Sequence, residues 1–333
     1  MNKIKYTATL LLFGIIIFFK GYTIVIGQTK PVLVVLNKTD NDMAIIDPVS
    51  MKVTAKVPVG VGPHEVVFSE DGKTAFVANY GTGPQPGNSL SIIDVAAAKE
   101  IRRVDLGPLL RPHGIQLIGG KLYFTAETSR AIARYDPATT KVDWIMGTGQ
   151  NVSHMIAGSR DQKQFYTANI GSNTVTAFAF QNVPPAGSTI TQIAVGRQPE
   201  AIDISPDAKE VWVGLNQDNG IDVIDTATNK VVKRIDLGGR PYRVRFTPDG
   251  KHVINPTWPA NELIIVDAAT KTIVRRIKIE GTPFGIDFSK DGNFAYVTAL
   301  QPDRVHRVNL KTGMVEASLE TGATPDGVAI TGQ

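Results

Sequence analysis

Cysteine is absent from this chain of 333 residues. Its absence excludes a disulfide framework, a thiolate metal site and the covalent attachment of a c-type haem. Net charge is also scarce: the formal charge is +4, and Lys3, Lys5 and Lys20 lie in residues 1–27, which contain no Asp or Glu. Without that segment the formal charge falls from +4 to +1. A nearly neutral domain lacks the broad basic surface of a nucleic-acid-binding protein, so we expect no nucleic-acid partner.

A long apolar run lies near the N-terminus. Residues 1–27 start with a basic segment, continue with an apolar run over residues 8–19, and reach a small residue at Gly27. This order is typical of a secretory signal peptide that is cleaved before Gln28. The alternative is an uncleaved anchor of ~18 to 20 residues, but Lys20 would then lie near the centre of the bilayer. We therefore expect an exported protein, periplasmic or extracellular, with residues 28–333 as one domain and no membrane span after cleavage.

A short phrase returns seven times along the chain: a turn that ends in Pro, or once in Ser, precedes a hydrophobic strand. The repeated residues are Pro63, Pro112, Ser153, Pro199, Pro241, Pro283 and Pro325. Consecutive copies lie 49, 41, 46, 42, 42 and 42 residues apart. Periods of roughly 40 to 50 residues, with several short strands in each unit, are typical of a β-propeller. The 31 Gly and 20 Pro fit an array of tight turns.

Each unit is predicted to contain four antiparallel strands. In the unit that follows Pro63, hydrophobic alternation and turn residues place them at residues 64–69, 74–79, 89–94 and 101–106. The Asp residues that end the third strands, Asp47, Asp225 and Asp267, precede turns, where a short carboxylate accepts backbone N–H bonds. We therefore assign these carboxylates to structure.

Three recurring pieces resemble a known family. They are Ser/Thr-x-Asp-Gly-Lys (residues 247–251), an aromatic-Val-x-Asn strand end (residues 76–79) and Ile-Asp-x-Ala-Thr-x-Lys-x-Val (residues 224–232). Together they resemble the YVTN-type β-propeller repeat of YncE-like and surface-layer exported proteins. The resemblance covers residues 28–333 and implies an all-β propeller. It implies no particular activity, because that family has no single shared function.

The strand count predicts seven blades. Residues 32–59 supply only three strands, whereas residues 326–330 form a lone strand at the other end. Joining them makes a seventh four-stranded blade, closed by both termini, and leaves no open sheet edge across the ring. Because a closed ring has no edge that must pair, we expect a monomer.

The resemblance also implies that the strand after each repeated Pro lines the axial channel. The residue after each Pro or Ser should then face the axis at one end, and together these residues form a ring. Its members are His64, His113, His154, Glu200, Tyr242, Phe284 and Asp326. We expect any site to lie in the funnel above this ring.

Three of the five histidines, His64, His113 and His154, occupy the ring position on consecutive blades. Three imidazoles flanked by the carboxylates of Glu200 and Asp326 resemble the ligand set of a divalent metal ion, and they do not distinguish Zn, Cu, Mn or Ca. The alternative is that each His hydrogen-bonds the backbone of a neighbouring blade.

A bound ion would acidify a water molecule or polarise a carbonyl group. Glu65 or Glu200 would then accept a proton, and Arg111 or Arg240 would stabilise an anion.

Aromatic side chains are expected on the other side of the funnel. Tyr242 and Phe284 could close an apolar wall of a ligand pocket, with Trp258 and Tyr80 above them, or could simply pack. The Gly-rich segment 81–88 lacks the Lys-Ser/Thr of a phosphate-binding loop and is interpreted as a surface lid.

Two functions of different classes remain. The first is a cell-envelope binding protein whose funnel recognises a small molecule or an envelope protein. The second is a metal-dependent hydrolase or lyase that acts on a small anionic or polyhydroxylated substrate. The absence of any complete catalytic signature favours the binding protein.

Overall fold

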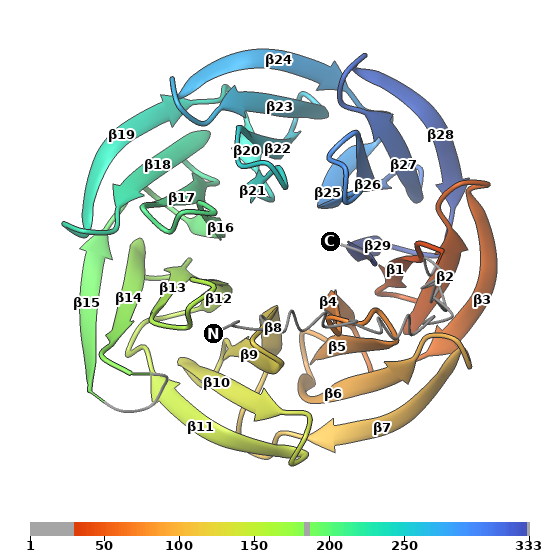
Figure 1. Ribbon diagram of the computed structural model, residues 1–333, viewed down its shortest axis with the longest axis horizontal. Helices are drawn as coiled ribbons and strands as arrows, with labels where there is room; N and C mark the ends of the chain where they lie inside the picture. Colours follow the sequence, from red (N-terminus) through yellow and green to blue (C-terminus); the bar gives the residue numbers. More distant parts are fainter. Residues whose placement is uncertain (1–29, 183–186, 332–333) are drawn as a thin grey trace, which may run out of the picture. The chain divides into compact units, whose positions relative to one another are not determined.

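Figure 1 shows the computed structural model, which describes residues 30–182 and 187–331. The predicted signal segment, residues 1–27, lies outside the described residues. The described chain from Pro31 onwards forms seven antiparallel sheets arranged as a ring of blades (Figure 1). In these described ranges, no helix is long and apolar enough to cross a membrane. The predicted seven-bladed all-β propeller is confirmed.

Six blades consist of four strands ordered from the axis to the rim, and in the remaining blade the innermost position is occupied by two short strands. The first three blades contain β29 (Pro325–Ile330), β1 (Leu33–Asn37), β2 (Asp42–Asp47) and β3 (Lys52–Pro58); β4 (Pro63–Phe68), β5 (Thr74–Gly81), β6 (Pro86–Asp94) and β7 (Lys99–Asp105); and β8 (Pro112–Ile118), β9 (Lys121–Ala126), β10 (Ala131–Asp136) and β11 (Lys141–Gly147).

The other four blades follow in the same order around the ring. They contain β12 (Ser153–Gly158), β13 (Gln164–Asn169), β14 (Thr174–Phe180) and β15 (Ser188–Ala194); β16 (Pro199–Ile204), β17 (Glu210–Leu215), β18 (Gly220–Asp225) and β19 (Lys230–Asp236); β20 (Arg240–Pro241), β21 (Arg245–Phe246), β22 (His252–Trp258), β23 (Glu262–Asp267) and β24 (Thr272–Lys278); and β25 (Thr282–Phe288), β26 (Phe294–Leu300), β27 (Arg304–Asn309) and β28 (Met314–Glu320).

The core lies between neighbouring blades. Second strands such as β5 and β17 are apolar and buried along most of their length, because a neighbouring blade covers each of their faces. Fourth strands such as β7 contain both polar and apolar residues and are largely exposed at the rim. Within each blade, the second strand is therefore apolar along most of its length, and the fourth strand at the rim is interrupted by polar residues.

The ring is closed by both ends of the described chain. Strand β1 lies between β2 and β29, and it pairs Leu33 with Ile330 and Val35 with Val328. Beyond the ladder, the Thr331 N–H donates to the carbonyl of Val32 at 2.9 Å. The predicted seventh blade, made from the two ends, is confirmed.

The carboxylates assigned to turns have that role. Oδ1 of Asp225 accepts the N–H of Thr228 at 2.8 Å, and Oδ1 of Asp267 accepts the N–H of Thr270 at 2.7 Å. Asp47 accepts the N–H of Val49 at 2.8 Å.

Two local features differ from the sequence prediction. The inner strand after Pro241 is split into β20 and β21, because its partner strand β22 contains Pro256, which has no N–H for the ladder. The predicted lid over residues 81–88 is shorter, because Gly81 pairs with Pro86 and extends the hairpin. Only residues 82–85 form the loop.

We predict that removal of β29 opens the ring. A chain that ends at Gly322 should lose at least about 4 kcal/mol of unfolding free energy and should self-associate, because β1 then exposes an unpaired edge. Urea unfolding and size-exclusion chromatography measure both effects, with a chain that ends at Thr331 as the control. Equal stability and an unchanged elution volume would contradict the closure.

Candidate functional site

The predicted ring is formed by the inner strands of the seven blades (Figure 1). Six of its residues lie on β4, β8, β12, β16, β25 and β29, and Tyr242 lies between β20 and β21. In several blades the turn into the inner strand requires a left-handed residue just before the repeated Pro or Ser. Gly62, Arg111 and Val152 adopt φ angles of 59°, 56° and 57° there. The repeated phrase therefore places the ring residues at equivalent points of the turn.

The three ring histidines contact one another in sequence order. The ring centroids of His64 and His113 are 5.0 Å apart, and those of His113 and His154 are 3.8 Å apart with an interplanar angle of 33°. His113 is only 3% exposed. Nδ1 of His64 donates to the carbonyl of Gly62 at 2.8 Å, which leaves Nε2 as the acceptor. The prediction that these histidines lie together is therefore correct.

Two carboxylates and a tyrosine complete a cluster around the imidazoles. Oε2 of Glu127 lies 3.6 Å from Nδ1 of His154, and Oε1 of Glu200 lies 3.9 Å from Nε2 of His154. The ring of Tyr80 lies 4.5 Å from that of His64 and 5.3 Å from that of His113. We call His64, His113, His154, Tyr80, Glu127 and Glu200 the histidine cluster.

Several buried atoms of the histidine cluster have no hydrogen-bond partner among the described residues. Nδ1 of His113 has none, and Nδ1 of His154 and Oε2 of Glu127 face each other at 3.6 Å, which is too long for a full hydrogen bond. Buried polar atoms without partners are costly, and such atoms usually bind water or a ligand. The cluster therefore offers free donor and acceptor positions at one place.

Burial controls the protonation of the cluster. It lowers the pKa of His64 to about 4, with Asp326 acting in the opposite direction, and it also holds the pKa of His113 well below its ordinary value. Burial raises the pKa of Glu200 and works to raise that of Glu127, but hydrogen bonding to His154 and Tyr80 outweighs it and lowers the pKa of Glu127. At neutral pH, His64 and His113 are thus neutral and Glu127 is ionised.

Arg111 covers the cluster from the outside. Its guanidinium group lies 4.7 Å from the centroid of the Tyr80 ring, and its Nη2 donates to the carbonyls of Thr82 and Gly83 at 2.9 and 2.8 Å. The short loop, Arg111 and Tyr80 therefore form stacked layers above His64. This arrangement supports the interpretation of the loop as a lid.

Arg243 lies across the axial channel. It forms a short ion pair with Glu65, which is 178 residues away in sequence, and lies 3.4 Å from Oδ1 of Asp326. Lys38 approaches the other oxygen of Asp326 at 3.0 Å. Burial works to raise the pKa of Asp326, but Lys38 and Arg243 outweigh it and lower that pKa. Asp326 is therefore an ionised member of a charge network.

Glu65, one of the two predicted proton acceptors, belongs to the same network. Burial raises its pKa even though Arg243 opposes the change. Glu200, the other predicted proton acceptor, accepts a short hydrogen bond from Nδ2 of Asn216. The two carboxylates consequently have different surroundings, and only Glu200 approaches an imidazole in the contacts described above.

The predicted aromatic wall consists of two separate pairs. Tyr242 and Phe284 stack with their centroids 4.2 Å apart, and Nζ of Lys38 lies 5.9 Å from the centre of the Phe284 ring. Arg240 lies 4.9 Å from the centre of the Trp258 ring, which is its register partner on the same blade. Arg240 is thus placed for a cation–π contact at the edge of the site.

The histidines do not form a metal site in the observed arrangement of the described residues. The rings of His113 and His154 lie against each other, with centroids 3.8 Å apart and an interplanar angle of 33°, and Nδ1 of His64 is engaged by the carbonyl of Gly62. Among residues 30–182 and 187–331, no group of three or more His, Cys, Asp or Glu side chains could hold an ion. The metal role of these histidines stays a prediction, and we derive no catalytic step from it.

An axial cavity of about 340 Å³ lies one layer below the ring. Glu65, Met155 and Arg243, which follow ring positions on their strands, line it, and it extends to Glu70 and Thr331. The lining residues do not include the ring members. Ring and cavity are therefore successive layers of the channel.

Three residues of the site are not among the predicted site residues: Lys38, Glu127 and Arg243. Lys38 and Glu127 occupy a second repeated position, directly after the residue that pairs with the repeated Pro. Tyr80 and Trp258 occupy the same position, so comparison of the repeats there would have found the set. Arg243 directly follows the ring position and is the only cation at that point of the seven phrases.

The family model of YNCE-like beta-propellers matches residues 22–332. A search of curated proteins gave no match.

Solved structures resemble the fold at low sequence identity. Hydrazine synthase of Kuenenia stuttgartiensis is 19% identical, with a TM-score of 0.66, over 82% of this chain and 90% of that chain. A dihydro-heme d1 dehydrogenase, NirN in complex with DHE, is 15% identical, with a TM-score of 0.63, over 90% and 74%. A functionally unknown protein from Desulfotomaculum acetoxidans is 13% identical, with a TM-score of 0.73, over 90% and 98%. At these identities the likeness concerns the fold alone.

We predict that acid destabilises the protein through His64. The unfolded imidazole gains its proton near pH 6.5, whereas the folded one stays neutral until about pH 4. Stability is therefore fully present above pH 6.5 and falls by up to about 3 kcal/mol as the pH drops towards 4. His64→Asn, which keeps a donor for Gly62, should lose less stability over this range in urea unfolding. His252→Asn is the control, and equal pH slopes for wild type and His64→Asn would refute this assignment.

Proposed function

We propose that this chain, which belongs to the YNCE-like β-propeller family, is an exported cell-envelope protein that binds a small ligand at its histidine cluster. The observation that carries the proposal is the group of buried, unpartnered atoms on His113, His154 and Glu127. Two adjacent blades, β8–β11 and β12–β15, contribute these atoms to one place, and each atom would gain a hydrogen bond from a bound molecule.

The chemistry of the cluster selects a class of ligand. The carboxylate of Glu127 accepts hydrogen bonds, and a neutral imidazole both donates and accepts one. Arg111 and Lys38 add positive charge nearby. A hydroxylated molecule with an acidic group satisfies these positions, and this is the class that the sequence indicates for the substrate of the alternative hydrolase or lyase.

Tyr80 and Arg111 would control access to this ligand. Tyr80 lies directly on His64 and His113, and Arg111 holds the loop over residues 82–85 through two hydrogen bonds. Movement of this stack would expose the imidazoles without disturbing a blade. We therefore assign Tyr80 and Arg111 to ligand entry, and Tyr242, Phe284, Trp258, Arg240 and Asp326 to the surrounding wall.

A thermal-shift panel tests the proposal on purified residues 28–333 without an affinity tag. The probes are gluconate, citrate, glucose, haemin and the ions Zn²⁺, Cu²⁺, Mn²⁺ and Ca²⁺. Haemin is included because one structurally similar protein is a dihydro-heme d1 dehydrogenase. We expect gluconate or citrate to raise Tm by about 2 °C or more at saturation. His113→Ala and His154→Ala should abolish the shift, and His252→Ala should retain it.

Two results would oppose the proposal. A Tm shift that persists in both cluster variants places the ligand elsewhere, and the absence of any probe-dependent shift removes the support for ligand binding. Elemental analysis of wild type beside the His64→Ala/His113→Ala/His154→Ala variant decides the metal role separately. Stoichiometric metal in wild type alone would identify the histidines as ligands.

Export is tested on the full chain expressed in a bacterial host. We expect a mature protein that begins at Gln28, in the periplasmic fraction or the medium, because residues 1–27 have the order of a signal peptide. Ile16→Arg interrupts the apolar run and should leave the uncleaved chain in the cytoplasm. Intact mass spectrometry distinguishes the two forms, and a full-length wild-type mass in the membrane fraction would support the anchor instead.

A further inference from the structure

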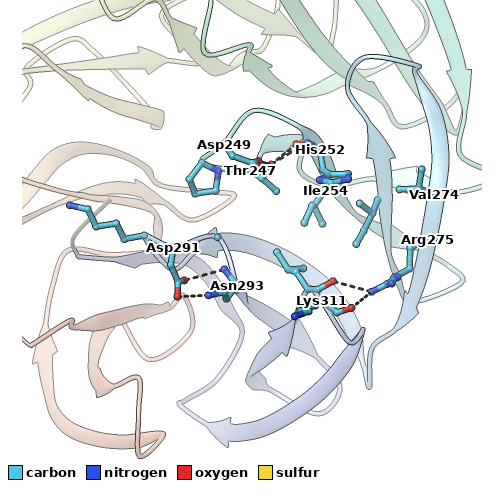
Figure 2. Close-up of a pocket in the computed structure, with 14 residues that line it drawn as sticks. Thr247, Asp249, His252, Ile254, Val274, Arg275, Asp291, Asn293 and Lys311 are labelled. Atoms are coloured by element: carbon cyan, nitrogen blue, oxygen red, sulfur yellow. Dashed lines mark hydrogen bonds between the residues drawn. The ribbon is translucent and has the colours of Figure 1, made fainter.

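A second cavity lies far from the histidine cluster in the fold, between the blade of β20–β24 and the blade of β25–β28. It is a groove of about 760 Å³ (Figure 2). Ile254 and Ile265 form its floor, Val274 and Leu310 line a wall, and Arg275 closes one end. Nη1 of Arg275 donates to the carbonyls of Leu310 and Lys311 at 3.0 and 2.9 Å, which joins the two blades there (Figure 2).

The groove occurs where the repeat lacks an aromatic side chain. The blades can be compared at one position of the second strand. It lies three residues before the residue that pairs with the repeated Pro or Ser. Five blades carry a buried aromatic residue there: Phe76, Tyr123, Tyr166, Trp212 and Tyr296. The blade of β22 carries Ile254 there, and the blade of β1 carries Val34. An isoleucine side chain is shorter than an aromatic ring, so the space towards the next blade is not filled.

Neighbouring interfaces show what fills that space elsewhere. Trp212 packs against Phe246 of the next blade, with ring centroids 5.7 Å apart, and Lys271 closes the same interface through a 2.7 Å ion pair with Glu210. Between β9 and β13, the hydroxyl of Tyr123 donates to Oε1 of Gln162 at 2.9 Å.

Small residues replace these closing groups at the groove. Gly292, in the turn between β25 and β26, occupies the position that Gln162 has in the turn between β12 and β13. Gly313, in the turn between β27 and β28, occupies the position that Lys271 has in the turn between β23 and β24. A Cβ at Gly292 would meet no atom closer than 3.7 Å, and one at Gly313 none closer than 3.5 Å. Ile254 and Gly313 therefore leave the space of the groove unfilled, whereas Gly292 is the residue that this turn also has at Gly72 and Gly250.

The lining of the groove includes three cations, Arg275, Lys290 and Lys311, and two carboxylates, Asp249 and Asp291. Each of the two carboxylates accepts a hydrogen bond within its own turn. Oδ1 of Asp249 accepts from the hydroxyl of Thr247 at 2.7 Å, and Oδ1 of Asp291 accepts from the hydroxyl of Ser289 at 2.6 Å. The ammonium groups of Lys290 and Lys311 form no hydrogen bond or ion pair with any described residue. Two exposed cations above an apolar floor favour a ligand with an apolar ring and a negative charge.

We propose that this groove binds a small aromatic carboxylate. Its ring takes the place that aromatic side chains take between other blades, above Ile254 and against Val274. Its carboxylate is held by Lys290 and Lys311. This site is separate from the histidine cluster and does not depend on the function proposed for that cluster.

Isothermal titration calorimetry with indole-3-acetate and with indole tests the groove, because the two probes share a ring and differ in charge. We expect wild type to bind indole-3-acetate at least tenfold more tightly than indole. Lys290→Glu/Lys311→Glu, which alters exposed side chains only, should weaken indole-3-acetate at least tenfold and change indole less than threefold. Ile254→Tyr introduces the aromatic residue type that five other blades have at this position and should abolish binding of both probes.

Lys73→Glu is the matched control, because Lys73 lies on the equivalent turn of another blade, and it should leave both affinities unchanged. His113→Ala should also leave them unchanged, which separates this site from the histidine cluster. The inference is overturned if wild type gives no binding heat with indole-3-acetate at millimolar concentration. It is equally overturned if the charge-reversal variant binds that probe as wild type does.

Discussion

The pairing of β29 with β1 is the constraint on which the rest of the propeller depends. Every blade packs its second strand between two neighbours, so an open ring would leave buried apolar faces exposed at the gap. Closure by hydrogen bonds between segments almost 300 residues apart removes that gap. It also sets the channel geometry, because seven inner strands must converge on one axis. The contact between three histidines from consecutive blades is a direct consequence of this convergence.

The narrow channel also explains the buried charges. Arg243 reaches from its own blade to Glu65 and Asp326, and Lys38 pairs with Asp326 from another direction. Removal of a single partner would leave an uncompensated buried charge, which is generally far more costly than loss of the whole network. The network therefore ties several blades together beneath the histidine cluster. The charge network and the histidine cluster cannot be altered independently, because His64 and Asp326 influence each other's protonation.

Both candidate sites arise where the blades carry different residues at one repeated position. The ring position directly follows the repeated Pro or Ser, and the repeat does not specify a residue type there. Three adjacent blades can therefore carry histidine at this position. At the second-strand position the repeat usually requires an aromatic residue, and Ile254 opens the groove where that requirement is relaxed. Repeated features build the scaffold, whereas features confined to one or a few blades provide the chemistry.

The sequence by itself determined the number of blades, the strand order and the circular order of the ring residues. Those properties follow from the repeat period and from local pairing between consecutive strands. Only the tertiary structure decided which side chains meet: His113 stacks on His154, and Arg243 pairs with Glu65 across 178 residues. The physical reason is that the contacts depend on channel width, on rotamers and on burial, which repeat spacing does not encode. The groove beside Ile254 likewise needed two blades to be placed face to face.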